Sequence, residues 1–244
     1  MLVAAYLALP PYSFTGKLDL VGFSICHQLP ERSFFLGGHQ LPLCARDTGT
    51  YLGAMATLAV LLAGKRRRRN GLPVAPVLIS LAAAFAFFGI DGLNSYADAL
   101  PLVPQLYTPS NYLRLASGMG CGIAIVAIVL PLFNYSVWRD LEDGPILDVR
   151  GFLGILGVAG LLYAAVAWGP GWLYHPLALV NIVGVLLVLS IVNGLLAYLI
   201  AGRERTAHSW LDTLPILATG LFMAALELGV LGYVRYAMER TVAI

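Results

Sequence analysis

The sequence predicts an all-α protein, a polytopic bundle of about six transmembrane helices with a small extracytoplasmic cap near its N-terminus. Three observations predict this class. Charged residues make up 11% of the chain, whereas soluble domains carry about 25%. The mean hydropathy is +0.80, and the apolar residues lie in long segments separated by short polar breaks. The net charge of +2 is too small to indicate a nucleic-acid partner.

The first predicted element is an apolar stretch at residues 1–10. It is too short to span a bilayer, which needs about 20 residues, and it lacks the basic start of a signal peptide. We interpret it as a short or half-inserted helix, or as the end of a longer helix, that stops at Pro10 and Pro11. A mildly amphipathic stretch at residues 18–25 and a polar loop follow it and form the cap.

Six later segments are long and apolar enough to cross a membrane. They run over residues 45–64, 72–91, 111–134, 151–169, 176–201 and 213–236. The breaks between them are charged or rich in Gly and Pro, as in the basic run 65–69. We therefore divide the chain into an N-terminal half-helix and cap (1–44), a three-span core (45–134) and a three-span C-terminal half (135–244).

The basic residues predict the orientation of the bundle. The loops after the first, third and fifth spans hold nine of the fifteen basic residues: Lys65, Arg66, Arg67, Arg68, Arg69, Arg139, Arg150, Arg203 and Arg205. Short cytoplasmic loops are enriched in Lys and Arg. These loops are thus expected on the cytoplasmic side of the cell membrane. The cap, the 91–110 loop and the C-terminus are expected on the outer side.

Glycine pairs at helical spacing suggest where helices pack closely. Gly49 and Gly53 are four residues apart in the first span, as are Gly118 and Gly122 in the third. Such pairs let two helix backbones approach each other. Because glycine is common in membrane helices, the pattern alone does not say which helices meet.

Metal-ligating side chains are concentrated in and beside the cap. Thiolate, imidazole and carboxylate groups, which zinc accepts, are offered by Cys26, His27, His39, Cys44 and Asp47. The last two share one helix face, since they are three residues apart. We predict a site for zinc or a similar divalent metal. A Cys26–Cys44 disulfide and a purely structural set of polar groups stay open as alternatives, because cysteine spacing does not separate them.

Arginines are expected in the same outer layer. Arg32, Arg46 and Arg114, with Asn111 at the start of the third span, are candidates for binding an anionic lipid headgroup, since guanidinium groups hold phosphate and carboxylate with two parallel hydrogen bonds. The alternatives are snorkelling towards the headgroups and ion pairs within the protein with Glu31, Asp47 and Asp91, because charges in membranes are usually paired.

Two carboxylates are the candidate catalytic residues. Glu227 lies within the sixth span, and a carboxylate inside a membrane is a functional candidate. Its structural alternatives are an ion pair with Arg114 or a hydrogen bond to Asn181 or Asn193. Asp91 ends the second predicted span on the outer side and so meets the polar layer of the cap.

Two stretches resemble a known family. Residues 26–34 read Cys-His-Gln-x-Pro-x-Arg-Ser-Phe, and residues 42–53 read Pro-x-Cys-Ala-Arg-x-Thr-Gly-x-Tyr-x-Gly. They resemble the DUF2085 predicted membrane proteins, and the likeness extends over residues 20–122. It implies a membrane protein of undefined activity. Family members often have Cys where this chain has Asp47, an exchange that can keep a metal ligand but removes a Cys-x-x-Cys redox pair.

The function expected from these features is an outward-facing metal site, acting as a hydrolase or transferase on a lipid or another membrane-embedded substrate. A metal-bound water would attack an ester or phosphoester that the arginines hold. The alternative is a transporter or lipid-handling protein, with Arg114 and Glu227 as a coupling pair and a structural Cys26–Cys44 disulfide. A third hypothesis is a non-catalytic subunit of a membrane complex.

Overall fold

The computed structural model describes residues 13–64, 67–97 and 104–242, so the predicted half-inserted helix at 1–10 lies outside the described residues. The described chain contains seven α-helices and two short two-stranded sheets, which confirms the all-α prediction. The α-helices are α2 (Phe14–Ile25), α3 (Ala45–Ala63), α4 (Ala75–Ala97), α5 (Asn111–Val137), α6 (Val149–Trp168), α7 (Tyr174–Ile200) and α8 (Leu214–Val242).

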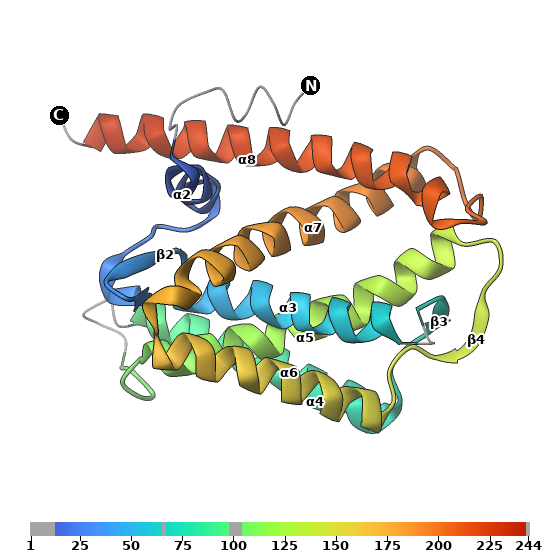
Figure 1. The fold of residues 1–244 in the computed structure, drawn as a ribbon, viewed down its shortest axis with the longest axis horizontal. Helices are drawn as coiled ribbons and strands as arrows, with labels where there is room; N and C mark the ends of the chain where they lie inside the picture. The colour runs from blue at the N-terminus through green and yellow to red at the C-terminus, as the bar shows by residue number, and fades with distance from the viewer. Residues whose placement is uncertain (1–12, 65–66, 98–103, 243–244) are drawn as a thin grey trace.

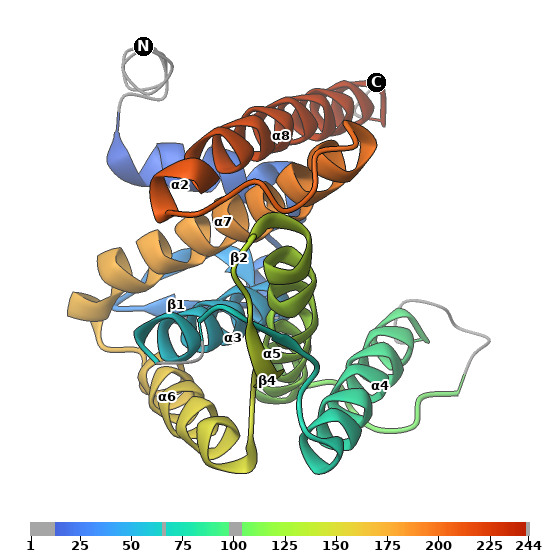
Figure 2. The same cartoon turned by 90° about the vertical axis from the view of Figure 1, so that its right-hand side faces the viewer.

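All six predicted long helices are present, from α3 to α8. Five of the described helices, α4 to α8, are long and apolar enough to cross a membrane. The sixth, α3, is not among these five, and Arg46 and Asp47 in its first turn lower its mean hydropathy. It forms the centre of the bundle, with α5 beside it, α7 and α8 above and α6 and α4 below (Figure 1). In the view turned by 90°, α4 lies at the edge of the bundle (Figure 2).

Helices α3 and α5 pack backbone to backbone through the two predicted glycine pairs. A Cβ atom added at Gly49 would lie 2.9 Å from the Met119 amide nitrogen, and one at Gly122 would lie 2.8 Å from the Ala54 amide nitrogen. Added carbons at Gly53 and Gly118 would clash with the facing backbone in the same way. The glycines are therefore required by the close approach of these two helices.

The cap is a short helix followed by a hairpin. Helix α2 is seen end-on in Figure 1 and so crosses the long helices. After the single turn η1 (Pro30–Arg32), strand β1 (Ser33–Leu36) pairs antiparallel with β2 (His39–Cys44). The hairpin turns at Gly37 and Gly38, whose φ angles of +57° and +87° favour glycine.

One predicted boundary at the cap end is wrong, and a proline nearby lies in a strand. Pro42 lies in β2, and α3 begins at Ala45. A two-stranded hairpin accommodates proline because each strand has a free edge. Asp91 was expected at the end of the second span, but α4 continues to Ala97. Asp91 therefore lies inside the helix, and its carboxylate is paired with Arg46, as described below.

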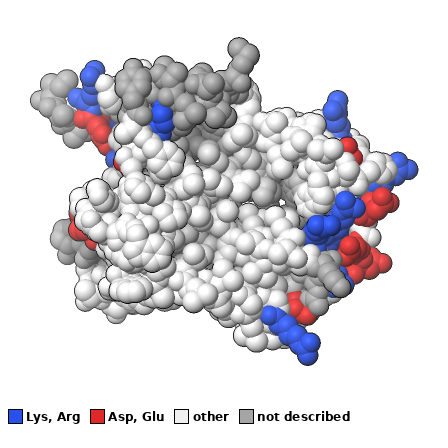
Figure 3. Space-filling view, viewed as in Figure 1, with Lys and Arg blue, Asp and Glu red and all other residues white. Residues whose placement is uncertain are grey.

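The two ends of the bundle differ in charge. Figure 3 shows Lys, Arg, Asp and Glu gathered at the right-hand end, a smaller group at the left-hand end, and few charged side chains between them. The described basic residues of the three basic loops are Arg67, Arg68, Arg69, Arg139, Arg150, Arg203 and Arg205. Strand β3 (Arg69–Gly71) pairs with β4 (Glu142–Pro145) and joins two of these loops. The cap lies at the opposite end, in agreement with the predicted separation of basic loops and cap.

Candidate metal centre and nearby charged residues

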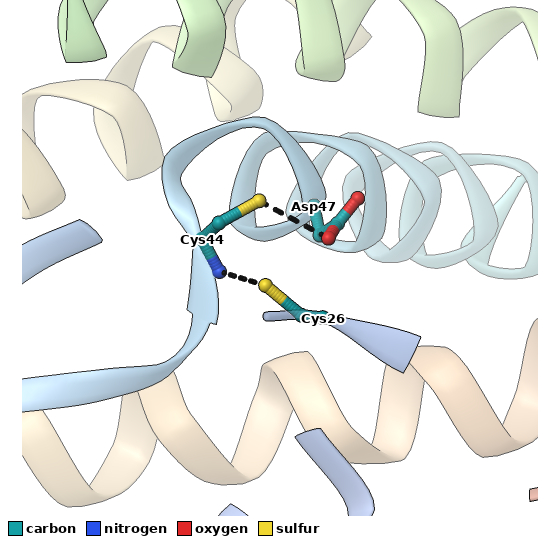
Figure 4. A group of neighbouring side chains, drawn as sticks. All are labelled: Cys26, Cys44 and Asp47. Atoms are coloured by element: carbon teal, nitrogen blue, oxygen red, sulfur yellow. Dashed lines mark hydrogen bonds between the residues drawn. The ribbon is translucent and has the colours of Figure 1, made fainter. Parts of the chain in front are cut away.

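Three of the predicted metal ligands meet where the cap joins α3. Cys26 follows α2, Cys44 ends β2, and Asp47 lies in the first turn of α3. Their sulfur and carboxylate oxygen atoms all lie within 4.8 Å of one another. The Cys44 thiol donates to Asp47 Oδ2 at 3.1 Å, and the Cys44 backbone N–H donates to Cys26 Sγ at 3.0 Å (Figure 4). Both cysteines are free.

The two thiols differ in electrostatic environment. The contact with the Cys44 side chain, together with the hydrogen bonds from the backbone N–H groups of Gln28 and Cys44 to its sulfur, lowers the pKa of Cys26. The contact with Cys26, and then burial, raises the pKa of Cys44. Because hydrogen bonds to the charged form favour it, Cys26 is the thiol that becomes a thiolate more readily.

Gln28 fixes the turn that carries Cys26. Its φ of +54° is uncommon for a residue other than glycine. Its side chain donates to the backbone oxygens of Asp19 at 3.0 Å and Pro42 at 2.9 Å. Its backbone carbonyl oxygen accepts a hydrogen bond from the Gln40 side chain at 2.8 Å. These bonds stabilise a backbone conformation that costs free energy. Gln28 is part of the family-like stretch, but its role could not be predicted from that stretch.

Arg235 of α8 holds the same turn from the other side. Its Nη1 donates to the carbonyl oxygens of Phe23 and Cys26, and its Nη2 donates to that of His27 at 3.1 Å. Its guanidinium carbon also lies 3.9 Å from the centre of the Phe23 ring. Arg235 could not be recognised as a site residue from the sequence, in which it is an arginine near the end of an apolar segment.

The two predicted histidine ligands lie outside this group. The His27 side chain is exposed. His39 is also exposed, and its ring centre lies 5.2 Å from that of Tyr174. Together with His175 and Asp19, His39 lines a cavity of about 460 Å³ beside the cap. Among the described residues, the group of possible metal ligands consists of Cys26, Cys44 and Asp47 and contains no histidine.

Arg46 and Asp91 form an internal ion pair. Arg46 Nη2 lies 2.6 Å from Asp91 Oδ2, and the Asp91 side chain is fully buried. The same carboxylate accepts hydrogen bonds from Ser117 at 3.1 Å and from the Tyr107 hydroxyl at 2.8 Å. Burial, together with this bond to Asp91, raises the pKa of Tyr107 to about 12. For Arg46 the structure therefore shows the ion pair that the sequence left open, and Asp91 joins α3, α4, α5 and the 104–110 loop.

Arg114 is linked to this pair through one side chain. Its Nε donates to Ser95 Oγ at 3.5 Å, and Arg46 donates to the same oxygen at 2.9 Å. Its Nη1 donates to Asn111 Oδ1 at 3.0 Å. Ser95 therefore links Arg114 to the ion pair of Arg46 and Asp91.

Glu227 has a separate partner. Its Oε2 accepts a hydrogen bond of 3.1 Å from Asn193, which joins α8 to α7. This bond is one of the structural alternatives predicted for Glu227. Arg114 is bonded instead to Ser95 of α4 and Asn111 of its own helix. The described contacts therefore do not join Glu227 and Arg114 in one site.

The apolar helices and the separated polar ends define an integral membrane protein of the helical-bundle class. Residues 26–128 match the DUF2085 family, described as a predicted membrane protein. An uncharacterised protein of Methanothermobacter thermautotrophicus is 35% identical over 113 residues, which cover 43% of this chain and 86% of the relative. An uncharacterised protein of Methanocaldococcus jannaschii is 29% identical over 118 residues, which cover 48% of this chain and 69% of the relative. This chain belongs to the DUF2085 family.

The family match includes Cys26, Cys44 and Asp47, and also the pair of Arg46 and Asp91. It ends within α5, so α6, α7 and α8 lie beyond it. No solved structure matches the chain.

Proposed function

We propose that the cap binds a zinc-like divalent metal ion through Cys26, Cys44 and Asp47. The observation that carries this proposal is the convergence of two sulfurs and one carboxylate oxygen within 4.8 Å. Neighbouring ligand atoms around a tetrahedral zinc ion lie about 3.5–3.8 Å apart, given Zn–S and Zn–O distances of about 2.3 and 2.0 Å. Small side-chain movements would therefore bring the three atoms into coordination.

Two further features favour a metal over a disulfide. A disulfide would use both sulfurs but leave the Asp47 carboxylate, 3.1 Å from Cys44 Sγ, without a role. A metal ion would use all three groups and replace the proton that Cys44 shares with Asp47, since thiol ligands bind metals as thiolates. The backbone N–H groups that point at Cys26 Sγ would then support a negatively charged ligand from the second coordination shell.

Three protein ligands would leave one position of a tetrahedral ion for water or substrate, as in catalytic zinc sites. A zinc ion held there would supply a bound water whose lowered pKa makes it a nucleophile for an ester or phosphoester near neutral pH. The reaction we propose is hydrolysis or transfer on a lipid or another membrane-embedded substrate. The cap would face the outside of the cell membrane, because the basic loops gather at the opposite end of the bundle.

The test is elemental analysis of protein purified without added metal. The wild type should carry close to one zinc or similar ion per chain. Cys26→Ser, Cys44→Ser and Asp47→Asn should each lose most of it. Cys121→Ser is the matched control, because Cys121 is a buried cysteine of α5 outside the group, and it should retain the ion. Chelation should lower the thermal stability of the wild type but not of Cys44→Ser, since only a bound ion stabilises by mass action.

One result would replace this proposal with the disulfide. If the wild type is free of metal, and Cys26 and Cys44 resist alkylation until a reductant is added, the two cysteines are bonded to each other. The catalytic proposal would then fail with the metal site.

A further inference from the structure

Arg32, Arg46, Arg114 and Asp91 lie at the cap end of the bundle, and three of these four side chains are positively charged. Arg46 and Arg114 both donate to Ser95 Oγ, and the one carboxylate among the four belongs to Asp91. That carboxylate is already engaged at 2.6 Å by Arg46. Three guanidinium groups thus act together with one carboxylate, and two positive charges are left without an equally close negative partner among these four residues.

The excess of positive charge among these four residues matters most for Arg114. The residue is only 7% exposed, and its hydrogen bonds go to neutral groups, the Asn111 amide oxygen and the Ser95 hydroxyl. Charges at membrane depth must be paired or hydrated, because an isolated charge is costly there. The Nη2 nitrogen of Arg114 makes no hydrogen bond to the described residues, so part of its fork can still bind an anion.

Asn111 places Arg32 against the start of α5. Its Nδ2 donates to the backbone oxygens of Glu31 at 3.1 Å and Ser33 at 3.3 Å, the two neighbours of Arg32 in the chain. Its Oδ1 accepts from Arg114. One amide side chain therefore fixes both the turn that carries Arg32 and the guanidinium of Arg114.

The first turn of α5 adds to the positive potential. Ser110 caps this helix by accepting the Leu113 N–H at 3.2 Å, and other N–H groups of the first turn have no partner within the helix. A helix N-terminus carries a partial positive charge and favours phosphate groups. Two arginines and a helix start thus converge at the outer end of the bundle.

We propose that Arg32 and Arg114, positioned by Asn111, bind one phosphate group, as the phosphodiester of an anionic lipid headgroup or as free phosphate. Arginine forks suit phosphate because they offer two parallel donors to two oxygens. The place also fits a lipid, because α5 is one of the helices apolar enough to cross the membrane and Arg114 lies in its first turn. Arg46 is not part of this site, because it is committed to Asp91. The proposal does not depend on a metal at Cys26 and Cys44.

The test uses the full chain in a neutral detergent. Its thermal midpoint is measured during titration with phosphatidylglycerol, with phosphatidylcholine and with inorganic phosphate. Phosphatidylglycerol should raise the midpoint of the wild type more than phosphatidylcholine does. Arg32→Gln should weaken this effect about tenfold or more in lipid concentration, the loss expected for a charge-assisted hydrogen bond. Arg240→Gln is the control, because this exposed arginine of the same end stacks on Tyr236 instead.

Arg114→Lys covers the case in which Arg114→Gln does not fold. It keeps the charge but loses the fork, and it should also weaken the phosphatidylglycerol effect. If inorganic phosphate matches phosphatidylglycerol, the site binds the phosphate group alone; if only the lipid acts, its headgroup is the ligand. Equal shifts with phosphatidylglycerol and phosphatidylcholine, or an undiminished shift in Arg32→Gln, would overturn the proposal.

Discussion

The close packing of α3 against α5 makes Gly118→Ala a demanding test of the structure. The new Cβ would lie 3.0 Å from both the Arg46 carbonyl carbon and the Thr50 amide nitrogen, and closer still to the Arg46 carbonyl oxygen. Real Cβ atoms rarely approach other atoms so closely, and all three of these atoms belong to the backbone of α3. No side-chain rotation can relieve the contact, so the helices must move apart.

The size of the effect follows from two opposing contributions. Replacing a helical glycine by alanine favours the helix by about 1 kcal/mol. Overpacking a tight interface costs about 1–3 kcal/mol and occasionally more, and the rigid backbone on the far side of this contact places Gly118→Ala at or above the upper end. We therefore expect a net loss of about 2 kcal/mol or more in the free energy of unfolding.

The assay is reversible unfolding of the purified protein in mixed micelles, with Gly154→Ala as the matched control. Gly154 lies on α6, where an added Cβ meets nothing within 4 Å, so only the gain in helix propensity applies. The control should be neutral or slightly more stable than the wild type. If Gly118→Ala unfolds within about 0.5 kcal/mol of Gly154→Ala, the size of a neutral surface substitution, the glycine contact between α3 and α5 is wrong.

Two further predictions concern pH and topology. The pKa of Tyr107 is raised to about 12 in the folded protein. Its contribution to stability should therefore be complete below about pH 10, the ordinary tyrosine pKa, and be lost as the pH rises towards 12. Tyr107→Phe should not show this loss, and parallel curves of stability against pH for the two proteins would contradict the prediction. In a chain without its native cysteines, Glu31→Cys should react with an impermeant maleimide from outside the cell, whereas Arg203→Cys should react only after permeabilisation; the reverse pattern would invert the proposed orientation.

The sequence by itself determined the class of the fold and most of its helices. Hydropathy and helix boundaries depend on residues close together in the chain, so six long helices could be placed from local composition. The glycine pairs also predicted a close helix contact correctly. The relation between Cys44 and Asp47 was predictable for the same reason, because three residues span about one helical turn.

The tertiary structure decided the partners of the polar groups. Arg46 could have faced lipid or an acidic residue, and only the packing of both α3 and α4 against α5 brings it to Asp91, 45 residues away. Arg235 holds the carbonyl oxygen of Cys26 across 209 residues, a contact without a local signal. Which charged groups meet depends on the distances between packed helices, and these distances arise from burial and close contact over the whole chain. The sequence could therefore name the candidate metal ligands. Only the fold showed that Cys26 joins Cys44 and Asp47, whereas the side chain of the adjacent His27 is exposed.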